Sequence, residues 1–171
     1  MKLLFTSAFV LIINFSFAQN SPKQIPEWFK THMEEMVGTW KTDNAKYMSE
    51  NETWDAYSMV WEYGIGKMSI NGRLYGIKDG EESGDFWEFK TFWNPDDGKV
   101  YAYQFGGNGT LGKGEATADS VLQTFYYPNG QSAKVGHKAW FDEEGNHHTK
   151  SFNVTDDGKW EDRRYYVWKK G

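Results

Sequence analysis

Apolar and polar residues alternate along most of the chain after Gly38, and turn-forming residues interrupt this alternation about every ten positions. Such alternation is typical of β-strands that bury one face. The segments with this pattern are 38–43, 52–63, 67–78, 84–93, 99–106, 109–117, 119–127, 133–141, 147–155 and 159–169. Many short strands joined by turns favour an all-β barrel or sandwich, and we predict a single antiparallel up-and-down barrel of about 8–10 strands.

One segment before the strands has helical spacing instead. Its apolar positions recur at intervals of three and four residues, and they are Ile25, Trp28, Phe29, Met33 and Met36. Pro26 suits the first turn of a helix because its missing N–H would have no partner there. The pattern therefore predicts one short helix over 25–36, directly before the first strand.

The N-terminus has the pattern of a secretory signal peptide over residues 1–18. Lys2 is followed by an apolar run, 3–13, that is too short to span a bilayer, and Ser16 and Ala18 are small. We expect cleavage before Gln19, although the same run could also form a buried helix. The mature protein would then be one barrel domain, 19–171, exported to the periplasm or secreted, with no membrane insertion after cleavage.

Composition narrows the function classes. The chain has 171 residues, a formal net charge of −5, no cysteine, and 18% aromatic residues that include 9 Trp and 10 Tyr. The absence of cysteine excludes a disulfide scaffold, thiolate metal ligands and a cysteine nucleophile. The acidic balance disfavours a nucleic-acid partner, and the aromatic content disfavours a disordered chain. A small molecule or an oligosaccharide remains as the expected ligand. The sequence does not identify a protein partner.

Aromatic residues alternate along three of the predicted strands, 52–63, 84–93 and 99–106. Many of these rings fill the core. Tyr and Trp also combine an apolar face with a hydrogen-bonding group, which suits a wall that stacks sugar rings or holds an amphiphilic ligand. We therefore select Trp61, Trp87 and Tyr103 as candidate substrate-binding residues.

The expected hairpin register gathers polar residues on one face. A two-residue turn at Asn129-Gly130 would place Leu122 opposite His137. The next hairpin would pair His137 with Phe152, and a three-residue loop at 156–158 would pair Lys150 with Arg164 and His148 with Tyr166. The polar members of this face, which we expect to point into the barrel, are His137, His148, Lys150, Asp162, Arg164 and Tyr166.

We expect the opposite face of the same strands to be exposed to solvent. It carries Gln123, Lys134, Lys138, His147, Ser151, Asn153, Glu161, Arg163 and Lys169. Charges inside a barrel are costly unless they are paired or face a ligand cavity. The inward cluster is therefore either an Asp162–Arg164 ion pair that orders the core or a ligand site.

Gly38-Thr39-Trp40 follows the predicted helix and opens the first strand. This resembles the GxW opening of lipocalin-like (calycin) barrels. The resemblance implies that Trp40 closes one end of the barrel and that Arg163 or Arg164 packs across its ring. The chain is also similar in layout to secreted lipocalin-like domains of unassigned function from polysaccharide-degrading marine bacteria.

Nitrobindin-like haem barrels share this architecture, but their glycine pattern does not follow Trp40 and the last strand has no histidine. We therefore predict no cofactor. We also predict no metal site, because His147 and His148 are adjacent on a strand and point to opposite faces. The glycine-rich run 106–114 lacks a following helix, so it indicates close strand approach rather than phosphate binding.

Two functional hypotheses follow. In the first, the protein is a metal-independent dehydratase or lyase that acts by β-elimination on a uronate-containing oligosaccharide. His148 or His137 would be the base, Tyr166 the acid, and Arg164 or Lys150 would neutralise the carboxylate. In the second, the protein is a non-catalytic lipocalin-like binding module for a small amphiphile. An exported barrel with a filled interior is a third, purely structural alternative.

Overall fold

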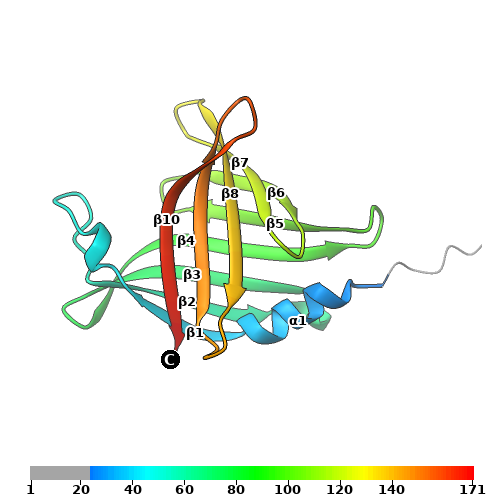
Figure 1. Cartoon of the computed structure of the whole chain (residues 1–171), viewed down its shortest axis with the longest axis horizontal. Helices are drawn as coiled ribbons and strands as arrows, with labels where there is room; N and C mark the ends of the chain where they lie inside the picture. The colour runs from blue at the N-terminus through cyan, green and yellow to red at the C-terminus, as the bar shows by residue number, and fades with distance from the viewer. Residues whose placement is uncertain (1–23) are drawn as a thin grey trace, which may run out of the picture.

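The computed structural model describes residues 24–171, so the predicted signal peptide and its cleavage site lie outside the described residues. These residues form one α-helix, α1 (Glu27–Met36), two short 3₁₀ helices, η1 (Ala45–Tyr47) and η2 (Ile65–Lys67), and ten strands (Figure 1). The strands are β1 (Gly38–Asp43), β2 (Ala56–Tyr63), β3 (Ser69–Lys78), β4 (Glu81–Asn94), β5 (Lys99–Gly106), β6 (Leu111–Ala116), β7 (Val121–Tyr126), β8 (Ser132–Phe141), β9 (His147–Val154) and β10 (Trp160–Lys170).

The strands close into an antiparallel up-and-down barrel in which each strand pairs with its neighbours in sequence and β1 pairs with β10. The predicted fold class is therefore confirmed, and the closed barrel is compatible with a lipocalin-like fold. Closure joins the first strand to the last, so the sheet does not have the two free edge strands of an open sheet. Within residues 24–171, no helix is long and apolar enough to cross a membrane.

The seam between β1 and β10 has fewer backbone pairs than the other strand contacts. Only Trp40 and Lys41 of β1 pair with β10, whereas six residues of β1 pair with β2. Side chains extend the seam beyond these two pairs: Thr42 Oγ1 donates to the Val167 carbonyl at 2.8 Å. Farther along, Tyr47 OH donates to the Tyr165 carbonyl and accepts from its N–H.

Helix α1 covers one end of the barrel, and the segment that contains η1 lies on the opposite side (Figure 1). The buried face of α1 consists of Phe29, Met33 and Met36. Trp40 is 2% exposed, and its Nε1 donates to the Met36 carbonyl at 2.7 Å, which ties the helix to the first strand. The expected role of this tryptophan at a barrel end is therefore confirmed.

The expected arginine across Trp40 is not there. The cation over this ring is Lys170, whose Nζ lies 5.2 Å from the ring centroid. Arg164 lies near the other end of the barrel, over the ring of Tyr47 at 5.0 Å. The difference arises because β10 runs antiparallel to β1, so the residue beside Trp40 comes from the end of β10 rather than from its start.

The expected register of two hairpins is wrong by one residue. Tyr126 pairs with Ser132, and Phe141 pairs with His147. The cause is loop length. In the first hairpin, Tyr127 and Gln131 bracket a three-residue loop that ends in a glycine with positive φ, instead of a two-residue turn. In the second, Asp142 and Asn146 bracket a three-residue loop where the expected pairing requires four residues. A three-residue loop of this kind displaces the partner strand by one position and thereby exchanges its two faces.

A β-bulge in β10 changes the third hairpin. The predicted pairing of Asp162 with Phe152 is confirmed, but the register shifts before Arg164, which pairs with Ser151 instead of Lys150. The bulge moves Arg164 and Tyr166 to the face opposite Asp162. The same shifts move three residues of the expected solvated face into the interior, and these are Gln123, His147 and Ser151.

The glycine-rich run brings strands close together, as expected. A Cβ on Gly114 would lie 1.8 Å from the Leu122 carbonyl oxygen, and one on Gly112 would lie 2.9 Å from the Phe125 ring. Both glycines therefore occupy places where a neighbouring chain segment fills the space of a side chain.

Candidate functional site

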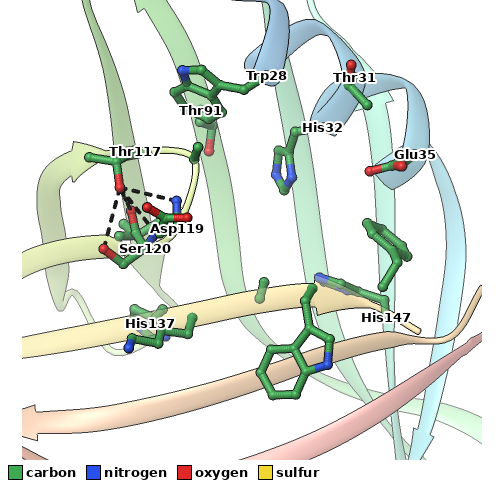
Figure 2. A pocket seen from close by; sticks show the side chains of 17 residues that line it. Trp28, Thr31, His32, Glu35, Thr91, Thr117, Asp119, Ser120, His137 and His147 are labelled. Carbon is green, nitrogen blue, oxygen red and sulfur yellow. Dashed lines mark hydrogen bonds between the residues drawn. The ribbon is translucent and has the colours of Figure 1, made fainter. Parts of the chain in front are cut away.

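The barrel interior contains three adjoining cavities. The mouth cavity, of about 350 Å³, lies beside the segment between β1 and β2, and the central cavity measures about 290 Å³. The helix-side cavity, of about 530 Å³, lies between α1 and the barrel (Figure 2). His137 lines all three cavities, and Arg164 and Tyr166 line both the mouth and the central cavity. We call the mouth and central cavities, which share these lining residues, the lumen.

A hydrogen-bonded cluster stands at the mouth. Arg164 makes a bidentate ion pair with Glu52, with Nη1–Oε1 and Nη2–Oε2 distances of 2.7 and 2.6 Å. Tyr57 OH donates to Glu52 Oε1 at 2.7 Å, and Arg164 Nη1 donates to Tyr166 OH at 2.8 Å. Tyr166 OH in turn donates to Asn44 Oδ1 at 3.2 Å. We call these five residues the mouth cluster.

The cluster fixes its own protonation states. The Arg164 guanidinium lowers the pKa of Glu52 to about 2, so this carboxylate is ionised at neutral pH. Burial, followed by the bond to Glu52, raises the pKa of Tyr57 well above its ordinary value. Burial also raises the pKa of Tyr166, against the opposing effect of Arg164. Both phenols therefore keep their protons at neutral pH.

The bulge in β10 brings a second cation to the mouth. Arg163 lines the mouth cavity beside Arg164. Among residues 24–171, Arg163 forms no ion pair, whereas Arg164 is neutralised by Glu52. The residues that line the mouth cavity therefore include two guanidinium groups and one carboxylate. That excess of positive charge suits an anionic ligand.

His137 is a neutral imidazole that faces the lumen. Its Nε2 is buried and has no hydrogen-bond partner within residues 24–171. Burial, with a smaller contribution from the charge of Arg163, lowers the pKa of His137 to about 4. An unpaired buried nitrogen costs about 1–3 kcal/mol, a cost that a ligand with a suitable hydrogen would recover.

A second buried histidine stands at the helix side of the lumen. His147 is 3% exposed, and neither ring nitrogen has a hydrogen-bond partner in the described part of the chain. Its ring stacks on Phe141 with centroids 4.9 Å apart and contacts the Trp40 ring at 5.7 Å. Burial lowers its pKa to about 3, and the charge of His32 acts in the same direction.

His32 projects from α1 towards the helix-side cavity (Figure 2). Burial lowers the pKa of this side chain too. Despite the three histidines that line this cavity, residues 24–171 contain no group of three or more His, Cys, Asp or Glu side chains placed to hold a metal ion.

Seven of the eight candidate residues border the central cavity, all except His148, and they are Trp61, Trp87, Tyr103, His137, Lys150, Arg164 and Tyr166. Trp61 stacks on Phe89 with centroids 5.2 Å apart, and its buried Nε1 has no partner among the described residues. The aromatic wall predicted from alternation is therefore present on β2 and β4.

Three of the candidates, His148, Lys150 and Tyr103, have side-chain partners on the outer side of the barrel, although Lys150 and Tyr103 also border the central cavity. His148 is hydrogen-bonded to Tyr165 OH at 2.6 Å and to Asp142 Oδ2 at 2.9 Å. Lys150 Nζ lies 2.7 Å from Asp162, whose side chain is 70% exposed. The Tyr103 ring stacks on the rings of Phe92 and Phe105 on the outer surface. The shifted registers cause the first two changes, so His148 does not face Tyr166 as expected.

Sequence reasoning missed Glu52, Asn44 and His147. Glu52 lies in the connection before β2, and 112 residues separate it from Arg164. The alternation of apolar and polar residues does not relate this connection to β10, so the pattern could not place Glu52 beside that strand. His147 was placed on the solvated face by the wrong register. The only sequence signal for it was its place beside His148, since one of two adjacent strand residues must face inward.

No protein-family model matches the chain, and no curated protein matches it at a significant level.

Proposed function

We propose that this is an exported carbohydrate-active protein whose lumen accepts an acidic, uronate-containing sugar and cleaves a carbon–oxygen bond in it by β-elimination. The observation that carries the proposal is the placement of His137. His137 lines the same two cavities as Tyr166 and Arg164, and its buried Nε2 has no hydrogen-bond partner among residues 24–171. A neutral imidazole, a protonated phenol and guanidinium groups are the side chains that such an elimination requires.

The proton transfers follow from these positions. His137 Nε2 takes the proton from the carbon next to the carboxylate, and the electron pair of that C–H bond forms the new C=C bond. The C–O bond at the β-carbon then breaks, and Tyr166 OH gives its proton to the departing oxygen. Solvent afterwards removes the proton from His137 and returns one to Tyr166. Acid and base assistance of this kind each contribute about 10²–10⁴-fold.

The guanidinium groups have separate roles in this proposal. Arg163, which has no carboxylate partner in the described chain, neutralises the carboxylate of the sugar and stabilises the negative charge that develops on it. Arg164 donates to Tyr166 OH at 2.8 Å and thereby stabilises the phenolate that forms when Tyr166 gives up its proton. The sequence-based roles of His148 and Lys150 therefore pass to His137 and Arg163.

A second function, binding without catalysis, is favoured by a different observation. Glu52 already neutralises Arg164 through a bidentate pair, and this pair also restrains the segment beside the mouth. A lipocalin-like module for a small amphiphile needs only the lumen, with Trp61 and Trp87 as ring surfaces. The unpartnered nitrogens of His137, His147 and Trp61 would then hydrogen-bond the ligand.

The decisive experiment compares turnover and binding on the same oligogalacturonates. Turnover is followed by the absorbance of the new conjugated double bond, and binding by tryptophan fluorescence. We expect His137→Gln and Tyr166→Phe to lower the rate at least ~100-fold. His148→Gln should leave the rate unchanged, because His148 lies outside the lumen.

Two outcomes would overturn the catalytic proposal. One is turnover that persists in His137→Gln. The other is an absence of turnover together with saturable binding that Trp61→Ala weakens, a result that would establish the binding module instead. Far-ultraviolet circular dichroism of each variant, compared with the parent protein, shows whether a lost signal reflects the site or the fold.

A further inference from the structure

A row of aromatic rings lies on the outer surface of β4 and β5. We call Phe92, Tyr101, Tyr103 and Phe105 the outer ring row. Phe92 lies 5.9 Å from Tyr101 and 5.8 Å from Tyr103, and Tyr103 lies 6.3 Å from Phe105, as measured between ring centroids. The Tyr103 ring is within 28° of parallel to Phe92 and within 19° of parallel to Phe105. Their similar orientation gives the sheet a continuous aromatic surface.

The apolar surface continues onto the neighbouring strands. Phe105 pairs across strands with Leu111, and Leu111 pairs with Tyr126. Phe105 and Tyr126 are 46% and 43% exposed, and Leu122 on the same strand as Tyr126 is 44% exposed. Contiguous exposed apolar surface of this kind marks an interaction site more often than isolated exposed residues do.

Two lysines flank the centre of the row. Lys90 on β4 and Lys113 on β6 are both the direct cross-strand partners of Tyr103. Neither ammonium group forms an ion pair with any of residues 24–171; Lys113 Nζ instead lies 5.2 Å from the ring centroid of Tyr126. Farther along, Lys99 is already paired with Glu115 at 2.6 Å. The centre of the row therefore combines ring faces with unpaired positive charge.

A surface groove of about 490 Å³ borders the row, and the residues that line it include Glu62, Asn71, Arg73, Glu88, Lys90 and Phe105. Its amide, carboxylate and ammonium groups can donate to and accept from hydroxyl groups. Lys90 and Phe105 belong to both the groove and the ring surface, so a ligand on the row would meet hydrogen-bonding groups along one side.

These features fit an extended chain of acidic sugars. One face of a pyranose ring presents C–H groups that pack on an aromatic ring, while its hydroxyl groups point sideways to polar neighbours. Carboxylate groups on the sugars would pair with Lys90 and Lys113. A protein partner fits less well, because Lys and Glu are depleted at the centres of protein interfaces and here they alternate with the rings.

We propose that the outer ring row and its two flanking lysines are a binding surface for an acidic polysaccharide. The surface lies on the outer side of the sheet, because the Tyr103 ring stacks on Phe92 and Phe105, whereas Ala102 and Gln104 on either side of it line the central cavity, which Tyr103 also borders. It does not depend on the proposed elimination. A protein with both sites would bind a polymer on its wall and take a chain end into its mouth.

The test is affinity electrophoresis of the mature protein through gels that contain polygalacturonate or the uncharged hydroxyethyl cellulose. Polygalacturonate should retard the protein, and Tyr103→Ala should raise the dissociation constant by about ten-fold or more. The double variant Lys90→Gln/Lys113→Gln should weaken binding several-fold at about 50 mM salt and flatten its salt dependence. The matched control is Trp140→Ala, which removes a ring that is 44% exposed on β8, outside the row.

Three results would overturn the proposal. Absence of retardation by polygalacturonate is the first, and equal retardation of Tyr103→Ala and the parent protein is the second. The third is a parent protein that is dimeric by light scattering and becomes monomeric in Phe105→Ala, since the row would then join two copies of the chain. Equal retardation by hydroxyethyl cellulose, with no effect of the lysine changes, would overturn the acidic class of the ligand. His137→Gln should bind the polymer normally, which separates this surface from the lumen.

Discussion

Arg164 on β10 and Glu52 in the segment before β2 form a bidentate ion pair at the mouth of the barrel, although 112 residues separate them in the sequence. The Glu52 side chain is 16% exposed and that of Arg164 is 35% exposed, so the pair is only partly shielded from solvent. Tyr57 and Tyr166 complete the hydrogen bonding of its two members. The pair thereby joins the β1–β2 connection to the last strand.

Glu52→Gln should reduce the free energy of unfolding by about 1–3 kcal/mol, because Arg164 would lose its charged partner while remaining partly buried. Urea denaturation at pH 7 measures this change. Glu115→Gln is the matched control: its partner Lys99 is 47% exposed, and such surface pairs contribute about 0–1 kcal/mol. Equal losses in the two variants would show that the mouth pair is no more than a surface contact.

Stability should fall with acid in two separable steps. The folded-state pKa values of His137 and His147, about 4 and 3, lie below the ordinary value of 6.5. The unfolded chain therefore binds protons first, and each histidine removes about 1 kcal/mol between pH 6.5 and 5.5. Glu52 has a pKa of about 2, so its stabilisation is complete above about pH 4.5 and is lost only as the pH falls towards 2.

Urea denaturation at a series of pH values separates these steps. His147→Phe should make the decline between pH 6.5 and 5.5 shallower, whereas Glu52→Gln should leave the shape of the profile in that interval unchanged and alter it only below about pH 4.5. A pH profile that is the same in His147→Phe and the parent protein would mean that His147 is not buried in its neutral form.

Trp40→Phe should destabilise the barrel by about 2–4 kcal/mol. The change removes the hydrogen bond to the Met36 carbonyl and part of a ring that is 2% exposed. Thermal unfolding measures the loss, and Trp140→Phe on the outer surface serves as the comparison, with an expected change within about 0.5 kcal/mol. If Trp40→Phe were equally mild, α1 would not depend on this ring.

Gly114→Ala should be among the most damaging substitutions in the sheet, because the new Cβ would meet backbone atoms of Leu122 and Gln123 rather than a movable side chain. We expect a loss of about 3 kcal/mol or more. Gly107→Ala is the matched control, since the nearest neighbour of its Cβ would be the Asp85 carbonyl oxygen at 3.1 Å, and we expect a smaller loss there. Soluble yield and urea midpoints distinguish the two variants.

The alternation of apolar and polar residues was sufficient to predict the strands, because a barrel wall has one buried and one exposed face along its whole length. The register of the hairpins was not predictable from the same pattern. The loop that contains Gly145 can hold either three or four residues, and the two choices assign opposite faces to His147 and His148. Tertiary packing against Phe141 and Trp40 decides between them.

The candidate site was recoverable only in part for the same reason. Arg164 and Tyr166 were expected to face inward, and they do so because the bulge after Asp162 compensates for a register that was otherwise wrong on β9. The bulge has no marker in the sequence. Glu52, which neutralises Arg164, comes from a connection whose path depends on the closed barrel.

The short seam between β1 and β10 has a consequence for how large a ligand can reach the lumen. Beyond Lys41, this contact is made by the side chains of Thr42 and Tyr47 and by the mouth cluster instead of by a continuous backbone ladder. Side-chain bonds can exchange one at a time with water, whereas parting a ladder exposes a whole row of amides. Opening the wall along this line would therefore break fewer backbone hydrogen bonds than opening it at any of the other nine strand contacts, so we expect a ligand wider than the mouth to enter here.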